Sequence, residues 1–113
     1  MFKTLVTKGA GGGYYVFDIP VAENLDLKKA AKAVGEKSIA MLPQKELLPL
    51  TGYVHGGCSP VGMKKQFPTV FHETVELFDT ICVSAGKIGA QVEVAPADLI
   101  ALLGAQTADV TAE

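Results

Sequence analysis

The sequence predicts a single α+β domain, and three observations support this fold class. A chain of 113 residues has the length of one ordinary domain. Hydrophobic residues make up 49% of it and charged residues 19%, a composition that supports a packed core and excludes a disordered chain. Several strand-like segments follow one another without a helix between them. This pattern excludes a doubly wound fold and predicts a mixed, mostly antiparallel sheet with flanking helices.

The first predicted elements are two strands joined by a glycine-rich turn. Phe2 to Val6 and Tyr14 to Val21 are rich in β-branched and aromatic residues, which favours strands. Lys8 to Gly13, with the sequence KGAGGG, lies between them. Consecutive glycines adopt positive φ at little steric cost, so the two strands are expected to form a hairpin.

The clearest helical pattern spans Asp26 to Gly35. Asp26 suits the N-cap and Gly35 suits the position after the last helical residue. The apolar face comprises Leu27, Ala30, Ala31 and Val34. The opposite face carries Lys28, Lys29 and Lys32. A short strand at Ser38 to Met41 and a short helix at Pro43 to Leu48 are expected next.

The second half predicts three further strands and one helix. The strands are expected at Thr69 to His72, Thr80 to Gly86 and Ala90 to Ala95, the last two forming a hairpin. The helix should begin at Pro96 and end at Gly104. We therefore expect the domain to span residues 1–104, followed by a loosely ordered tail over residues 105–113.

Charge and cysteine content limit the classes of function. The net charge of −2 argues against a general nucleic-acid binder, and all 10 basic residues are lysines, which lack the bidentate fork of arginine. Cys58 and Cys82 are too few for a disulfide framework. No apolar run approaches the ~20 residues of a membrane span, and no secretory signal opens the chain. We expect a cytoplasmic protein without a membrane segment.

The stretch TGYVHGGCSPVGMKKQFP, from Thr51 to Pro68, has no helical or strand period but gathers the residues best suited to chemistry. Cys58, with His55 three residues before it, could form a thiolate nucleophile, although no third orienting group is evident. The N–H groups of the GGCSPVG segment could instead bind an oxyanion, with Pro60 stiffening the loop. A purely structural turn is the third interpretation.

Metal and phosphate motifs are not supported by the spacing of residues. Cys58, Cys82, His55 and His72 fit no zinc pattern. The P-loop pattern is also missing, because Met63 stands where that motif requires a lysine. We therefore expect neither a metal nor a cofactor.

Five segments together resemble the signatures of the YbaK-like aminoacyl-tRNA deacylases, which include Cys-tRNA(Pro) deacylases and editing domains related to prolyl-tRNA synthetase. They occur in the family's order and are FKTL (2–5), LDLKKAAKAVG (25–35), TGYVHGGCSPVGMKKQFPT (51–69), VSAGKIG (83–89) and APADL (95–99). The resemblance implies one domain around a mixed, barrel-like sheet. It also implies hydrolytic removal, in trans, of a wrong amino acid from the 3′ end of a tRNA.

The resemblance also implies roles for individual residues. Lys3 matches the essential lysine of FKTL, whose ammonium would hold a phosphate or the ester oxygens. Gly56 and Gly57 match loop glycines whose backbone approaches the aminoacyl ester. We therefore expect Lys3, Gly56 and Gly57 to be catalytic. The expected substrate-binding residues are Thr4, Cys58, Ser59, Pro60, Ser84 and Gln91.

The resemblance leaves the amino acid that is removed open between cysteine and alanine. In Cys-specific members the thiol of the substrate attacks its own ester and leaves as a cyclic thiolactone, so positioning supplies much of the acceleration. Alanine-specific relatives would need a bound water. Cys58 is then expected to line the pocket rather than react. Gln91 stands where Cys-specific members carry an aspartate, so specificity for cysteine is not assured.

The expected partners are the 3′ end of an aminoacyl-tRNA and a prolyl-tRNA synthetase that delivers it. Contacts to tRNA phosphates are expected from Lys28, Lys29, Lys32, Lys64 and Lys65. The family normally carries several dozen residues before FKTL, whereas this chain begins inside that motif. The missing wall should expose apolar surface and favour a homodimer. The alternative function is a non-catalytic or truncated tRNA- or synthetase-binding module, and a general cysteine hydrolase ranks third.

Overall fold

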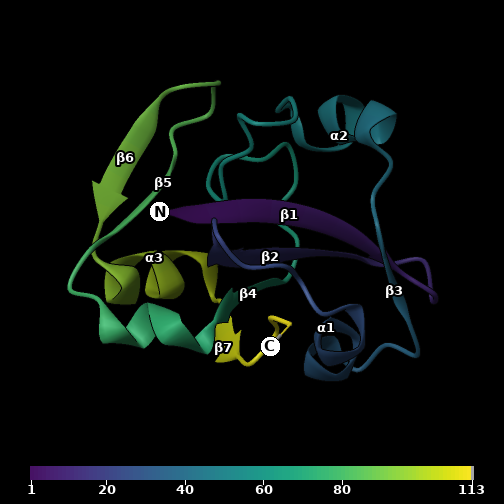
Figure 1. Ribbon diagram of the computed structural model, residues 1–113. Coiled ribbons are helices and arrows are strands. Elements are labelled where there is room, and N and C mark those ends of the chain that lie inside the picture. Colours follow the sequence, from purple (N-terminus) through teal and green to yellow (C-terminus); the bar gives the residue numbers. More distant parts are fainter. Residues whose placement is uncertain (113) are drawn as a thin grey trace.

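The structure, a computed structural model, describes residues 1–112 of the chain (Figure 1). Strands and helices alternate irregularly, and they form the single α+β domain that the sequence predicts. Within the described residues the elements are β1 (Phe2–Gly9), β2 (Tyr14–Pro20), α1 (Leu27–Val34), β3 (Ile39–Met41), α2 (Gln44–Thr51), β4 (Thr69–His72), the 3-10 helix η1 (Glu73–Leu77), β5 (Ile81–Ser84), β6 (Gln91–Val94), α3 (Pro96–Leu103) and β7 (Gln106–Ala108).

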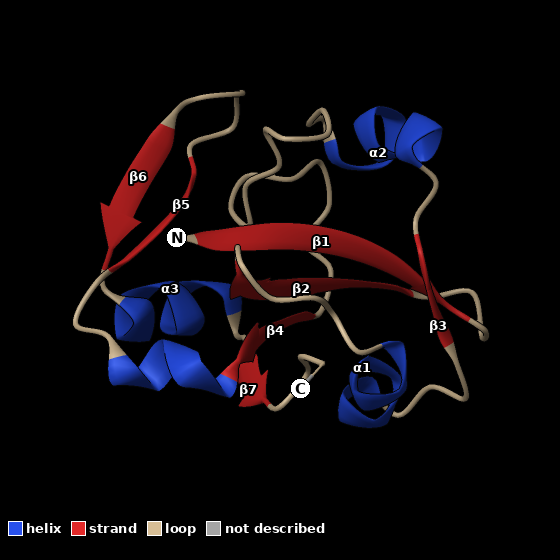
Figure 2. Cartoon of the chain, viewed as in Figure 1, coloured by secondary structure: helices blue, strands red, loops and turns tan. Residues whose placement is uncertain are grey.

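Within residues 1–112, five strands form one mixed sheet in the spatial order β3-β1-β2-β4-β7 (Figure 2). β1 pairs antiparallel with β2 along most of its length, but with β3 only through Thr7, Lys8 and Gly9. The pairs β2–β4 and β4–β7 are parallel. β5 and β6 form a separate antiparallel hairpin. Antiparallel pairing therefore predominates, as expected.

The expectation that the sheet closes like a barrel is wrong. A barrel requires its two outer strands to pair, so that no edge remains. In the described part of the chain the outer strands β3 and β7 have three residues each and lie at opposite ends of the strand order. The β5–β6 hairpin packs beside β1 without joining its ladder. As a result, the first half of β1 remains a sheet edge.

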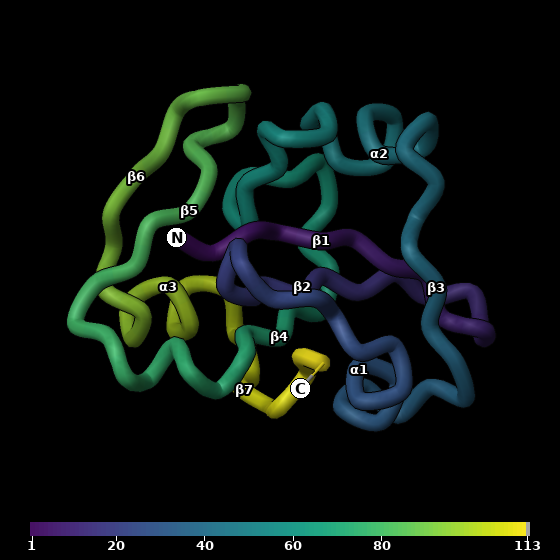
Figure 3. Tube along the Cα trace, in the orientation of Figure 1, coloured from purple at the N-terminus to yellow at the C-terminus, as the bar shows by residue number. Residues whose placement is uncertain are grey.

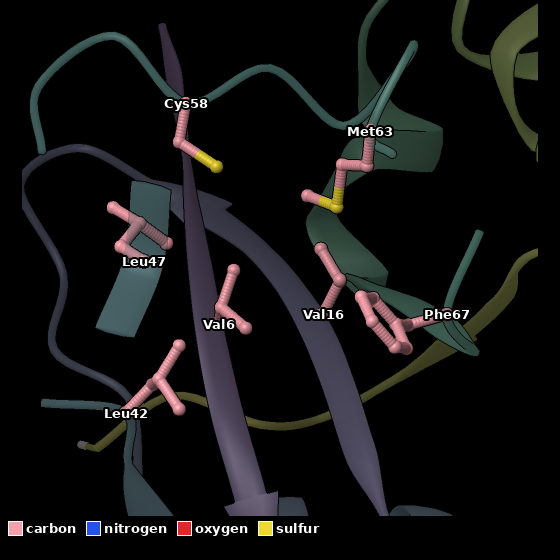
Figure 4. Close-up of a cluster of buried hydrophobic side chains, with 7 residues drawn as sticks. All are labelled: Val6, Val16, Leu42, Leu47, Cys58, Met63 and Phe67. Atoms are coloured by element: carbon pink, nitrogen blue, oxygen red, sulfur yellow. The ribbon is translucent and has the colours of Figure 1, made fainter. Parts of the chain in front are cut away.

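Three clusters of buried side chains form the core on the two faces of the sheet. Because side chains alternate along β2, Phe17 and Ile19 face α1 whereas Val16 faces the other side. The cluster on that other side comprises Val6, Val16, Leu42, Leu47, Cys58, Met63 and Phe67 (Figure 4). A third cluster joins the start of β1 to β5 and α3.

Helix α1 has the caps that its sequence predicts. The side chain of Asp26 accepts hydrogen bonds from the backbone N–H groups of Lys28 and Lys29, each at 2.9 Å. Gly35 ends the helix with a φ of 75°, in the left-handed region that glycine tolerates. Ala30 and Ala31 are buried against the sheet. Local signals were sufficient for this element.

The expectation of a loosely ordered tail after residue 104 is wrong, because this segment belongs to the fold. Gln106–Ala108 forms strand β7 beside β4. Val110 is fully buried, and its backbone N–H donates to Nδ1 of His72 at 3.2 Å. Asp109 makes an ion pair with Lys29 at 3.0 Å. All of these partners are distant in sequence, so no local pattern could reveal them.

The short 3-10 helix η1 between β4 and β5 was also not predicted. It buries only Val75 and leaves Leu77 exposed, so it carries no amphipathic period. Within residues 1–112, no helix is both long enough and apolar enough to cross a membrane.

Candidate active site

The free edge of β1 borders a cavity of about 230 Å³. Figure 3 shows the start of β1 lying beside β5. Three further segments complete the wall: α2, the loop that follows it, and the end of β5. The lining residues are Met1, Phe2, Lys3, Thr4, Leu5, Leu47, His55, Gly56, Cys58 and Ser84. Segments that are more than 80 residues apart in sequence therefore meet at one cavity.

Five of the residues expected at the site line this cavity. Lys3 and Thr4 come from β1, Gly56 and Cys58 from the loop, and Ser84 from the end of β5. Lys3, Thr4 and Ser84 are half-buried, so their polar groups are partly shielded from water. In this setting an ammonium or hydroxyl group interacts more strongly with a developing charge than it would in water.

The remaining expected residues lie outside the cavity lining. Gly57 is buried against the turn between β5 and β6. Ser59 lines a neighbouring groove, and Pro60 is fully buried. Gln91 is exposed on β6, where it pairs with Ser84 in the hairpin ladder. The sequence had indicated these positions, but whether each one reaches the cavity depends on the path of the loop and the hairpin.

The 53–62 loop is held by its own hydrogen bonds. The hydroxyl of Tyr53 donates to the carbonyl of Val61 at 2.6 Å, and Ser59 Oγ accepts from the N–H of Val61 at 3.2 Å. Gly56 has a φ of 85° and Gly62 a φ of 79°, values that favour glycine. The loop is therefore a preorganised wall of the cavity. It is a structural turn, and it is also placed where its backbone could bind a ligand.

Cys58 is a buried thiol rather than a thiolate. Its sulfur belongs to the apolar cluster that also contains Val6 and Leu47 (Figure 4). Burial, with a smaller contribution from the charge of Asp18, raises the pKa of Cys58 to about 12. A thiol with such a pKa is protonated at neutral pH and is a poor nucleophile. This argues against the cysteine hydrolase and supports a lining role for Cys58.

Asp18 is a site residue that the sequence analysis missed. It is fully buried and lies directly opposite Thr4 in the β1–β2 ladder. The hydroxyl of Thr4 donates to Asp18 Oδ1 at 2.5 Å, whereas Oδ2 has no hydrogen-bond partner. Burial raises the pKa of Asp18 to about 7, and the hydrogen bond from Thr4 opposes this rise. The available signal was a carboxylate between apolar neighbours in a strand.

The lysines expected to contact tRNA fall into two groups. Lys28 and Lys32 are exposed and border a hollow of about 430 Å³. Lys64 and Lys65 are exposed on the loop after α2, with the Lys65 ammonium 6.0 Å from the centre of the Phe67 ring. Lys29 differs from both groups. Its ammonium binds Asp109 and also donates to the carbonyl of Thr111 at 3.0 Å.

The cysteines and histidines considered as metal ligands do not form one cluster, although His55 and Cys58 line the same cavity. His55 lies at the cavity, whereas His72 is buried beneath the C-terminal segment. In the described part of the chain, no three His, Cys, Asp or Glu residues are placed to hold a metal ion.

A larger groove of about 700 Å³ adjoins the cavity. Val83 and Ser59 line it, next in sequence to the cavity residues Ser84 and Cys58. Its other walls are mainly aliphatic side chains of β6 and α3, with Asp98 as the charged residue. Because the smaller cavity contains the lysine, the hydroxyls and the glycine backbone, it is the better candidate for catalysis.

The fold and this cavity identify the class of protein. Residues 1–102 match the model of a family described as the aminoacyl-tRNA editing domain, and the chain belongs to that family. Its resemblance to YbaK-like editing proteins is thereby confirmed.

Particular relatives make the family assignment more specific. An Enterococcus faecalis (strain ATCC 700802 / V583) protein is 51% identical over 111 residues, which are 98% of this chain and 68% of the relative. Its provisional name is Cys-tRNA(Pro)/Cys-tRNA(Cys) deacylase EbsC. A crystal structure provisionally described as a trans-editing enzyme for prolyl tRNA synthetase superposes with a TM-score of 0.91 at 32% identity, covering 99% of this chain and 70% of that chain. A protein used as a scaffold for computational epitope grafting matches with the same TM-score and identity, over 99% of this chain and 71% of its own.

Proposed function

We propose that this chain is a trans-editing deacylase that removes cysteine or alanine from the 3′ end of mischarged tRNA(Pro). Membership of the editing-domain family and the names of the relatives support this proposal. The observation that carries it is the meeting of Lys3, Thr4, Gly56 and Ser84 at one cavity. The cavity has a volume of about 230 Å³, and such a small site suits a small aminoacyl group.

The chemistry assigned to this cavity is ester cleavage assisted by charge and position. The ammonium of Lys3 would offset the negative charge that develops on the ester carbonyl oxygen, or would hold the adjacent phosphate. The backbone of Gly56 lets the loop approach the ester without a side chain between them. Gly57 would support this loop from behind.

The attacking group comes from the substrate or from water, because Cys58 is held as a neutral thiol. For a cysteinyl ester, the substrate sulfur attacks the carbonyl carbon and the bond to the ribose 3′ oxygen breaks. The thiol proton ends on that oxygen, and a thiolactone leaves. For an alanyl ester, a water performs the same attack, and its hydroxyl remains on the released acid. Holding the attacking group near the carbonyl can supply a large share of the acceleration.

The proposed partners follow from this reaction. Lys28, Lys32, Lys64 and Lys65 would contact tRNA phosphates, and a prolyl-tRNA synthetase would bring the substrate to the cytoplasmic site of charging. Apolar side chains that are largely exposed support contact with such a partner or with a second copy of the chain. They are Leu77, Ile88 and Leu102, with exposed fractions of 79%, 71% and 70%.

Deacylation of a panel of substrates tests the proposed function. Purified protein is incubated with Cys-tRNA(Pro), Ala-tRNA(Pro) and Pro-tRNA(Pro), and the remaining aminoacyl-tRNA is measured over time. We expect hydrolysis of the cysteinyl or alanyl ester, and Pro-tRNA(Pro) left at its spontaneous rate. Mass spectrometry of the released product distinguishes thiolactone from free acid. Binding of tRNA without acceleration of any ester would instead identify a non-catalytic module.

A further inference from the structure

The buried carboxyl of Asp18 has no role in the chemistry proposed for Lys3 and the loop. It shares the β1–β2 register with Thr4, whose hydroxyl donates to its Oδ1 at 2.5 Å. Its second oxygen, Oδ2, is buried without a hydrogen-bond partner. A buried carboxyl that is only half satisfied is costly, so its presence next to a cavity residue calls for an explanation.

The hydrogen bond between these two residues fixes the polarity of the Thr4 hydroxyl. A hydroxyl has one proton to donate and two lone pairs that accept. An ionised carboxylate only accepts, so the single proton of Thr4 must point toward Asp18. The Thr4 oxygen can then offer only its lone pairs to the cavity. A ligand group that donates a hydrogen bond can therefore bind to the Thr4 oxygen, whereas another acceptor is repelled by it.

We propose that Asp18 is a positioning residue that holds the Thr4 hydroxyl as a hydrogen-bond acceptor toward the cavity, so that the site selects an aminoacyl group carrying a donor. The donor is the α-ammonium of the bound amino acid. This inference rests on the proposed function, because it assumes that Thr4 recognises the aminoacyl group.

The surroundings of Asp18 make this polarity sensitive to one proton. β1 places Thr4 against the carboxyl, β4 places Phe71 beside it in register, and the loop brings Cys58 close enough for their charges to interact. Among residues 1–112, no lysine or histidine forms an ion pair with it. Burial raises the pKa of Asp18 to about 7. Once protonated, Asp18 can donate to Thr4, and the Thr4 proton becomes free to point into the cavity.

The test uses paired variants at the two positions. Asp18→Leu keeps the branched shape of the side chain but removes the acceptor of the Thr4 proton. Thr4→Val removes the hydroxyl, and Thr4→Ser retains it. We expect Asp18→Leu and Thr4→Val each to raise KM at least 10-fold, and the double variant to lose no more than either single variant. Thr4→Ser should stay close to the wild type. Additive losses in the double variant would overturn the proposal.

A second readout separates this proposal from the proposed function. The probes are two stable amides of 3′-amino-3′-deoxyadenosine, one carrying alanine and the other its analogue without the amino group, propionate. We expect the wild type to prefer the alanyl probe at pH 8 by at least 10-fold, and Asp18→Leu to lose this preference. The preference should also shrink at pH 6, where Asp18 is protonated.

Each outcome of the two assays has a distinct meaning. A preference that persists in a wild type without deacylase activity would overturn the function and leave the role of Asp18 standing. Equal binding of both probes by an active wild type would overturn the role of Asp18 alone. Binding of neither probe, together with inactivity, would overturn both. If Asp18→Leu does not fold, Thr4→Val against Thr4→Ser gives the same comparison.

Discussion

At the scale of single residues, burial rather than residue type decides which groups react. Cys58 has the most reactive side chain of the 53–62 loop, yet its pKa is raised to about 12. Asp18 looks like an ordinary strand residue in the sequence, yet it is fully buried beside a cavity residue. Lys3, Thr4, Gly56 and Ser84, which the sequence motifs indicated, line one cavity, and their roles there stay predictions. The motifs could not predict Asp18, because its importance depends on the cross-strand pairing with Thr4.

The buried Asp18 should make the stability of the fold depend on pH. Its pKa is about 7 in the folded state and near 3.8 when the chain is unfolded. Between these values the folded state holds a proton that the unfolded state releases, so the free energy of unfolding falls as pH rises. From pH 5 to pH 8 the wild type should lose ~3 kcal/mol relative to Asp18→Asn. Urea unfolding of both proteins across this range measures the difference, and parallel curves would contradict a buried, titrating carboxyl.

At the scale of elements, the site depends on contact between the loop and the β5–β6 hairpin. A Cβ added to Gly57 would lie 3.0 Å from the backbone nitrogen of Ile88 and 3.1 Å from two backbone atoms of Lys87. These atoms cannot rotate away as a side chain would. The sequence signature indicated that Gly57 matters, but it suggested contact with the substrate. The structure instead shows close packing of two backbone segments.

Gly57→Ala should therefore separate the loop from the hairpin. We expect a loss of ~1–3 kcal/mol in stability, typical of overpacking, and at least a 10-fold loss of deacylase activity. Gly11→Ala is the matched control. A Cβ added at Gly11 would have as its nearest neighbour a carboxylate oxygen of the flexible Glu36 side chain, at 3.4 Å. Urea unfolding and deacylation rates are measured for both variants. Equal effects of the two substitutions would show that the contact with Lys87 and Ile88 is unimportant.

The predictability of each element follows from where its partners lie. Helix α1 was predicted because Asp26 and Gly35 cap it locally. β7 was not, since it pairs with β4, and the residues that follow it are held by His72 and Lys29, which lie far earlier in the chain. The positions of Ser59 and Gln91 outside the cavity depend on an irregular loop and an exposed hairpin. Neither the loop nor the hairpin has a sequence period that predicts which of its residues are buried.

At the scale of the whole molecule, the open sheet explains how one cavity draws on distant segments. β3 covers only the second half of β1, so the loop after α2 and the end of β5 can meet at the first half. The sequence predicted the α+β class and most strands correctly. It did not predict the open edge, since sheet closure depends on strand order and on the shortness of the outer strands.

The distribution of lysines predicts how tRNA binding depends on salt. The molecule has a net charge of −2, so binding to phosphates must come from local clusters. Replacing Lys64 and Lys65 by glutamine should lower the slope of log affinity against log salt by about 1.5, since each phosphate contact contributes ~0.7–0.9. Lys8→Gln is the control, because Lys8 is an exposed lysine of β1 and lies outside the loop after α2. An unchanged slope in the double variant would place the tRNA elsewhere.

In the proposed function, the cavity at the edge of β1 cleaves aminoacyl-tRNA and Lys3 is its principal catalytic residue. Single-turnover deacylation of Cys-tRNA(Pro) and Ala-tRNA(Pro) by the wild type, Lys3→Ala and Lys8→Ala tests this most directly. Both lysines lie on β1, but only Lys3 lines the cavity. We expect Lys3→Ala to lower the rate at least 100-fold and Lys8→Ala to change it less than 2-fold. Undiminished cleavage by a folded Lys3→Ala protein would overturn the catalytic role proposed for Lys3.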